Sequence, residues 1–167
     1  MGYIEESENA VVLPLAGGEP GTQQTVSFMI RNALDGASLP QVRALAESAV
    51  KGAPERDLAA EAQRIEKWVK GHLRYTRDGL NVEMLKTVPR ILGEIQSQGY
   101  FMGDCDDAST LSAALLLSLG HQVGFQVLGR GNVPHHVNVY DASAGVQVDP
   151  TGEPTGNFGY RRVYPVR

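Results

Sequence analysis

The stretch 103-GDCDDASTLSAALLLSLG-120 decides the fold of this chain, because it predicts a strongly apolar helix with the only cysteine at its start. Asp104 is a preferred N-cap residue, apolar side chains recur after it at helical spacing, and Gly120 ends the pattern. Cys105 is therefore expected at or near the first helical position. There the backbone N–H groups and the positive end of the helix dipole favour the thiolate over the thiol.

Two aspartates in the first helical turn act against this effect. Asp106 and Asp107 bring negative charge near the thiol, and like charge disfavours the thiolate. Full activation of Cys105 therefore requires a partner such as an imidazolium.

The composition of the chain limits the classes of protein to which it can belong. Its 167 residues with 42% hydrophobic content suit a single domain, 1–167, with an arm and accessory helices over 1–53 and a core over 57–167. A net charge of −4 gives no reason to expect a nucleic-acid partner, and one cysteine excludes an intramolecular disulfide. There is no signal-like start and no apolar run of membrane length, so we expect no membrane span and a cytoplasmic location.

Helical patterns dominate the chain before the cysteine. Residues 1–21 are expected to form an extended arm followed by turns. The pattern predicts helices over 22–34, from an N-cap at Ser38 to Gly52, over about 57–72, and from Pro89 onward. The segment after the third of these helices is expected to be a short extended exit and turn.

After the cysteine helix the hydrophobic period changes from helical to alternating. Alternation predicts strands around 123–127, 136–140 and 146–148, a hairpin connection over 141–145, and a fourth strand over 160–166. Helices followed by antiparallel strands predict an α+β domain with the cysteine helix packed on the sheet.

The strand region supplies the partners that a cysteine nucleophile needs. His136 lies on the second strand and Asp149 at the end of the third, so a hairpin centred near residue 143 places them nearly opposite each other. The carboxylate would orient the ring, which takes the thiol proton and returns it to the leaving group. The plain alternatives are a core cysteine and, for Asp149 before Pro150, a turn residue.

The other histidines are assigned simpler roles. His135 competes with His136, because adjacent strand residues face opposite sides and only one can meet Cys105. We favour His136 and expect His135 at the surface or the rim of a cleft. His72 is expected to cap a helix C-terminus, and His121, which follows a helix stop, to lie on the surface.

In combination these motifs resemble the transglutaminase-like superfamily. The segments are GDCDDASTLSAALLLSLG, HHVNVYD and VQVDPTG, preceded by AAEAQRIEKWVKGHLRYTRD, and they cover roughly Asp57 to Thr151. The resemblance implies a papain-like α+β fold with Cys105 as nucleophile, His136 as base and Asp149 as orienting carboxylate. The compact form of the motif is also similar to members encoded by tailed phages and prophages.

Two positions depart from the pattern of many members of the superfamily. Asn138 stands where an aromatic residue often follows the histidine, and Ala144–Val146 replaces a common tryptophan before the third strand. Both positions bear on substrate preference.

The resemblance implies thiol-dependent acyl transfer on peptide or side-chain amides, with a protein or peptide substrate and no cofactor. We expect hydrolysis rather than crosslinking, because nothing in the sequence identifies an amine-acceptor site. The alternative is a structural or binding module of a phage particle or its assembly pathway, with phage structural proteins as partners.

The acidic helix start also allows a metal hypothesis. Some periplasmic proteases that resemble this superfamily bind calcium around a similar motif, and Asp104, Asp106 and Asp107 supply carboxylates. No Asp-x-Asp-x-Asp loop is present, so we favour N-capping by Asp104 and pairing of another aspartate with a base such as Arg74 or Arg77. Ligand spacing for zinc is lacking, so no metal is expected.

An oxyanion formed during acyl transfer needs hydrogen-bond donors. The backbone N–H of Cys105 is one, and the second is expected just upstream, where Gln98 and Tyr100 are the available side chains.

Overall fold

The computed structural model describes residues 5–6, 10–14, 18–77, 82–131 and 133–166. The helices of this part of the chain are α1 (Gly18–Ala37), α2 (Pro40–Ala49), α3 (Leu58–His72), α4 (Val88–Gln98) and α5 (Cys105–Ser118). Its strands are β1 (Glu5–Glu6), β2 (Ala10–Pro14), β3 (Leu73–Tyr75), β4 (Val82–Lys86), β5 (Phe101–Gly103), β6 (Val123–Arg130), β7 (Val133–Asp141), β8 (Val146–Val148) and β9 (Tyr160–Pro165).

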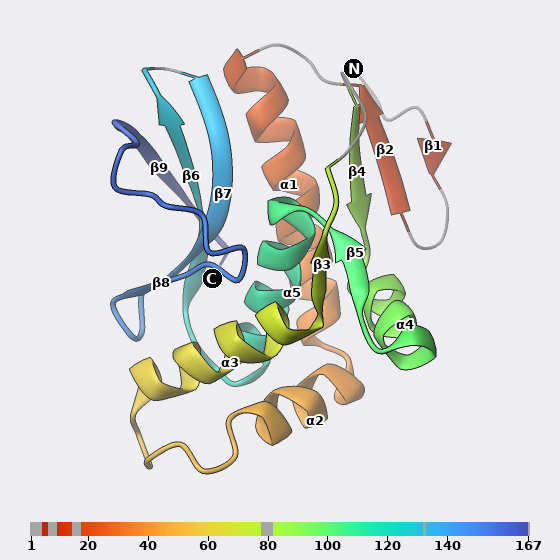
Figure 1. The fold of residues 1–167 in the computed structure, drawn as a ribbon, viewed down its shortest axis with the longest axis vertical. Helices are drawn as coiled ribbons and strands as arrows, with labels where there is room; N and C mark the ends of the chain where they lie inside the picture. The colour runs from red at the N-terminus through yellow and green to blue at the C-terminus, as the bar shows by residue number, and fades with distance from the viewer. Residues whose placement is uncertain (1–4, 7–9, 15–17, 78–81, 132, 167) are drawn as a thin grey trace.

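Helix α5 lies at the centre of the fold. It contacts α1, α2, α3 and α4 and also packs against β6 and β7 (Figure 1). Every residue from Asp106 to Ser118 is buried. A helix enclosed on all sides needs no polar face, which explains the continuous apolar run in its sequence.

The main sheet is antiparallel, with the strand order β8-β7-β6-β9. Alternate side chains of β6 and β7, including Phe125, Val127 and Val139, belong to the same buried core as α5. The predicted α+β fold class and the expected strands are confirmed, because alternation marks a sheet with one face in the core.

Two smaller sheets were not visible in the sequence pattern. The N-terminal arm forms strands rather than an unpaired segment, with the order β1-β2-β4. Strand β5 pairs in parallel with β3 and aligns Tyr75 with Gly103, directly before α5. Short strands whose partners are distant in the chain carry little local pattern, which is why they were missed.

Two predicted helix starts are wrong. Helix α1 begins at Gly18, inside the region expected to form turns, and extends beyond the predicted helix over 22–34. Helix α2 has Leu39 as its N-cap, and the Ser38 hydroxyl instead donates to the carbonyl of Asp35 at 2.7 Å. A serine hydroxyl readily donates to a nearby backbone carbonyl, and here it bonds to the last turn of α1 instead of capping α2. The parts of the expected turns at 15–17 and 78–79 lie outside the described residues.

The other predicted helix starts are confirmed. Asp57 caps α3 by accepting the Ala60 N–H at 2.9 Å, and Thr87 caps α4, which carries Pro89 in its first turn. Asp104 caps α5 by accepting the Asp106 N–H at 3.0 Å. Cys105 is therefore the first residue of α5, as its sequence predicts.

His121 is buried, so its predicted surface position is wrong. Its Nδ1 lies 2.6 Å from Asp141 Oδ2, and its Nε2 lies 2.7 Å from Glu61 Oε2. Burial alone lowers the pKa of His121, but the hydrogen bonds to Asp141 and Glu61 raise it above the ordinary value of 6.5. Two ionised carboxylates facing both ring nitrogens fit the imidazolium, which has two N–H donors.

This arrangement predicts a pH dependence of stability. Because the folded pKa of His121 is raised, its contribution is fully present below the ordinary value of 6.5 and is lost as pH rises through the folded pKa. Urea unfolding at a series of pH values should therefore show a free energy of unfolding that declines above pH 6.5. The decline should be smaller in His121→Gln, and an unchanged profile in that variant would contradict the assignment.

Gly129 makes a close backbone approach that excludes a side chain. The β6–β7 register shifts between Leu128 and Gly129, and a Cβ on Gly129 would lie 2.0 Å from the carbonyl oxygen of Val133. We expect Gly129→Ala to lower the free energy of unfolding by about 3 kcal/mol, measured with urea, because the backbone must shift. Gly156→Ala is the matched control, since nothing lies within 4 Å of the added Cβ. Equal midpoints for the two variants would contradict this prediction.

Candidate active site

Cys105 lies at the start of α5 with its side chain partly exposed. Its thiol donates to Asp106 Oδ1 across 3.8 Å. The immediate neighbours of the sulfur thus include a carboxylate that favours the protonated thiol.

His136 and Asp149 are joined by a hydrogen bond. The distance from His136 Nε2 to Asp149 Oδ2 is 2.7 Å, and His136 is only 8% exposed. His135 is exposed, and no hydrogen bond of its ring is among the contacts of the described residues. The two adjacent histidines therefore differ as predicted, with His136 in the interior and His135 at the surface.

The predicted register of this pair is off by two residues. Val148 pairs with Val139, and the same register continued by one residue brings Asp149 opposite Asn138 rather than His136. His136 is the diagonal neighbour. An even shift keeps the side chain on the same face of the sheet, so the contact survives the error.

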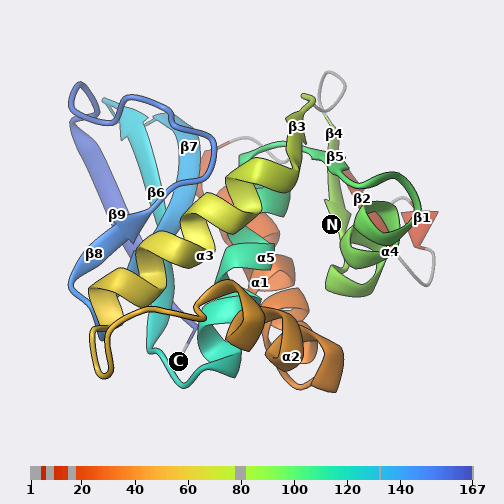
Figure 2. The ribbon, with the colours of Figure 1, turned by 60° about the horizontal axis from the view of Figure 1, so that its bottom comes forward.

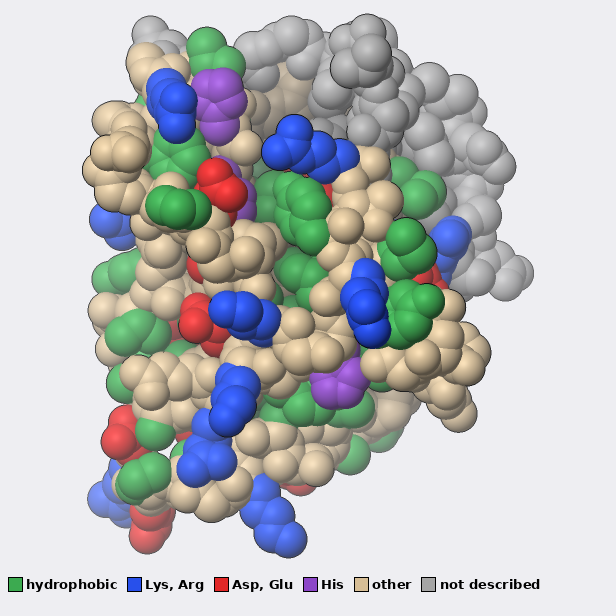
Figure 3. All heavy atoms as spheres, in the orientation of Figure 1, with side chains coloured by type: hydrophobic (Ala, Val, Ile, Leu, Met, Phe, Trp, Pro, Cys, Tyr) green, Lys and Arg blue, Asp and Glu red, His purple; other side chains and the backbone are tan. Residues whose placement is uncertain are grey.

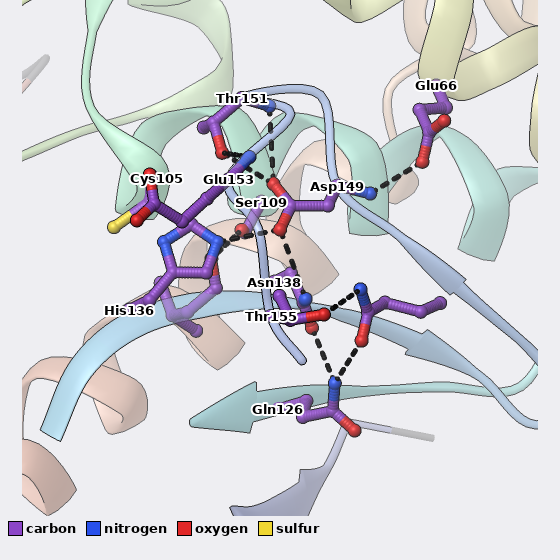
Figure 4. A network of polar contacts seen from close by, with 12 residues as sticks. Glu66, Cys105, Ser109, Gln126, His136, Asn138, Asp149, Thr151, Glu153 and Thr155 are labelled. Atoms are coloured by element: carbon purple, nitrogen blue, oxygen red, sulfur yellow. Dashed lines mark hydrogen bonds and ion pairs between the residues drawn. The ribbon is translucent and has the colours of Figure 1, made fainter. Parts of the chain in front are cut away.

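Helix α5, which begins at Cys105, is fixed to the strand that carries His136. The hydroxyl of Ser109, one turn after Cys105, donates to the carbonyl of Val137 at 3.2 Å and fixes α5 to β7 beside His136. In the view of Figure 4 the Cys105 side chain lies next to the His136 ring. The ring nitrogen on the side of the sulfur is Nδ1, which does not bond to Asp149.

The carboxylate of Asp149 is held by four hydrogen bonds. Oδ2 accepts from His136 and from Asn138 Nδ2 at 3.2 Å, and Oδ1 accepts from the N–H and hydroxyl of Thr151 at 3.2 and 2.6 Å. Burial alone raises the pKa of Asp149, but the bonds from His136, Thr151 and Asn138 lower it below 3.8. An ionised carboxylate only accepts, so Nε2 of His136 is the donor of their hydrogen bond, and in a neutral ring this arrangement leaves the lone pair on Nδ1.

Asn138 belongs to a line of amides across the main sheet. Its Oδ1 accepts from Gln126 Nε2 at 2.9 Å, and the same nitrogen donates to Gln147 Oε1 at 2.8 Å (Figure 4). Sequence reasoning noted Asn138 only as a departure from an aromatic position. The sequence does contain a signal for this line of amides. Each of three neighbouring strands carries one amide side chain, and the three lie on the same face of the sheet.

The acidic residues at the helix start have a different partner from the one expected. Asp107 accepts the backbone N–H of Lys86 at 3.1 Å, whereas the Arg74 guanidinium lies over the Tyr100 ring. Burial and the nearby Asp104 raise the pKa of Asp107 well above its ordinary value. Among the described residues, no group of three or more His, Cys, Asp or Glu is arranged to hold a metal ion.

Tyr75 is a neighbour of the thiol that sequence reasoning missed. It lies on β3, aligned with Gly103, and burial together with the nearby Cys105 and Asp104 raises its pKa. The side chain is 52% exposed, and its phenol keeps its proton and can donate a hydrogen bond. The only signal was the Arg-Tyr pair in the extended exit of α3. Of the two donors suggested instead, the Gln98 amide is bonded to the carbonyl of Tyr100 at 3.1 Å.

The surface and the helices give three further observations. In Figure 3, basic side chains on the visible face outside the grey atoms are dispersed rather than merged into one patch. Within the described parts of the chain, every helix is too short or too polar to cross a bilayer. His72, predicted as a helix cap, bonds through Nδ1 to the carbonyl of Trp68 at 2.7 Å in the last turn of α3, which confirms that role.

Comparison with known proteins supports the fold at a coarse level. No protein-family model matches the sequence, and no curated protein matches it. The structure is similar to the crystal structure of a proposed protease from Parabacteroides distasonis, with a TM-score of 0.58 and 11% sequence identity. The match covers 85% of this chain and 29% of the other. At this identity the likeness concerns the fold alone.

Proposed function

We propose that this protein is a thiol-dependent hydrolase of amides in proteins or peptides, with Cys105 as nucleophile, His136 as base and Asp149 as orienting carboxylate. The observation that carries the proposal is the 2.7 Å bond from His136 Nε2 to Asp149, which leaves Nδ1 for the thiol. The fold shared with a proposed protease favours the same class of substrate.

The reaction follows from these positions. Nδ1 of His136 takes the thiol proton while the Cys105 sulfur bonds to the carbonyl carbon of the amide. The tetrahedral intermediate collapses, the C–N bond breaks, and Nδ1 gives its proton to the departing amine. Water then attacks the thioester, loses a proton to Nδ1 and releases the acid, after which the thiol recovers its proton.

The oxyanion of the intermediate requires donors near Cys105. The first turn of α5 supplies backbone N–H groups and the positive end of the helix dipole. Tyr75 is the candidate for a second donor, because its phenol is protonated and it is aligned with Gly103, two residues before Cys105. Gln98 loses this role in the proposal, since its amide is bonded to Tyr100.

A covalent trap tests the nucleophile. Incubation with a peptide-amide electrophile, followed by intact-mass and peptide mass spectrometry, should add one probe to the native protein at Cys105. Cys105→Ser should gain no probe. Because the chain has one cysteine, a probe found at any other position is attached to a residue other than cysteine and would count as nonspecific labelling. Labelling of the wild type only after unfolding would overturn the proposal.

The second candidate is a structural or binding module of a phage particle or its assembly pathway, with phage structural proteins as partners. The contact of the Cys105 thiol with Asp106 favours it, because that carboxylate stabilises the protonated thiol. An inert native thiol is its expected result in the trapping experiment. The single domain, the cytoplasmic location and the absence of a nucleic-acid partner remain predictions.

A further inference from the structure

Helix α3 binds two distant segments of the chain through two carboxylates, and one of these segments carries Asp149 of the candidate site. Glu61 Oε2 meets His121, in the turn after α5, at 2.7 Å. Glu66 Oε2 accepts the backbone N–H of Asp149 at 2.7 Å, although the two residues are 83 positions apart. Figure 2 shows α3 crossing in front of α5 between β8 and β3, and Figure 4 shows the contact of Glu66 with Asp149.

The contact with Glu66 lies directly after the last residue of β8 that pairs with the sheet. Strand β8 ends at Val148, so Asp149 is the first residue beyond the paired segment. Its N–H is directed into a carboxylate of α3, which makes a charge-assisted hydrogen bond of good length. Glu66 is itself half-buried, so the bond is partly shielded from water.

The position of the Asp149 backbone determines where its carboxylate lies. The side chain is short, and its Oδ2 must stay 2.7 Å from His136 Nε2 while Oδ1 keeps the two bonds from Thr151. A shift of the main chain at Asp149 would lengthen the bond to the ring. The ring would then be free to turn its Nδ1 away from Cys105.

We propose that Glu66 is a positioning residue of the candidate site: by accepting the Asp149 N–H, it keeps Asp149 on His136 and so keeps Nδ1 toward Cys105. This inference rests on the proposed function. It assigns Glu66 no contact with substrate, and its effect passes entirely through Asp149.

The test measures the rate of Cys105 alkylation by iodoacetamide from pH 5 to pH 9 in the full chain. Glu66→Ala removes the acceptor, and Glu66→Asp shortens the side chain by one methylene while keeping the charge. Both should lower the rate constant at pH 7 by about tenfold, since a misplacement of about 1 Å costs up to ~100-fold. Glu66→Gln, whose amide oxygen still accepts, should recover most of the rate. Gln63→Ala, an exposed change on the same helix, is the control.

A double-mutant comparison with Asp149 distinguishes a positioning role of Glu66 from a purely structural one. In an Asp149→Ala background, Glu66→Asp should cause no further loss of alkylation rate. A wild-type pH–rate profile in Glu66→Ala and Glu66→Asp, with only the melting temperature lowered, would overturn the inference. An equal loss in the presence and absence of Asp149 would overturn it too. If His136→Ala and Asp149→Ala leave the rate unchanged, the proposed function itself fails, which is a distinguishable result.

Discussion

Replacing His136 with alanine should lower the rate of Cys105 alkylation by iodoacetamide at pH 7 by about 30-fold, because a thiol with an ordinary pKa near 8.5 is only ~3% thiolate there. In the proposed mechanism the ring accepts the thiol proton through Nδ1, while Asp149 holds Nε2 at 2.7 Å. Without the ring, the thiol is left with Asp106 as its neighbour at 3.8 Å, and this carboxylate opposes ionisation. Cleavage of an amide substrate should fall further, by about 100-fold or more, because general acid–base catalysis is also lost.

His135→Ala is the matched control for this substitution. His135 is the adjacent residue on β7, but it is exposed, so its removal should leave the alkylation rate at the wild-type value. The measurement is a time course of intact-mass spectra at several pH values. A wild-type thiol that reacts only as pH passes about 8.5, with His136→Ala identical to it, would refute the enzyme and support the module.

Replacing His121 with alanine should lower the free energy of unfolding by about 3–5 kcal/mol, the cost of removing one partner from a buried charged group. Asp141 is fully buried, and its Oδ2 loses the imidazole that lies 2.6 Å away. Glu61 loses its partner on the other ring nitrogen, and with it α3 loses its tie to the turn after α5. Urea unfolding at pH 6, followed by circular dichroism, measures the change.

His72→Ala is the comparison for the stability measurement. His72 makes one hydrogen bond to the Trp68 carbonyl at 2.7 Å and stacks on the Trp68 ring, and it is only half-buried. Loss of one such bond should cost about 1 kcal/mol. An equal loss in the free energy of unfolding for the two variants would show that the two carboxylates around His121 add no more stability than one ordinary hydrogen bond.

The sequence predicted the cysteine helix because its signals are local. An N-cap at Asp104, a long apolar run and a terminal glycine all lie within one stretch, and helix starts depend on such neighbours. The strands of the main sheet were predictable for the same reason, since alternation is a property of each strand. Even a register error of two residues left His136 and Asp149 on one face, because side chains repeat with a period of two.

The tertiary structure alone decided which charged groups meet in the interior. His121 follows a helix stop and has the local pattern of a surface residue, but α3 covers it with a carboxylate from 60 positions away. Glu66 has the appearance of a solvent-facing helical residue, and only the packing of α3 beside β8 gives it the Asp149 N–H. Periodicity records which face of an element is apolar, and it contains no record of the partner that a single polar side chain finds after the elements pack. The helix with its cysteine and the strands with their histidine and aspartate were therefore determined by the sequence pattern, whereas the contacts that hold them in place were decided by the packing.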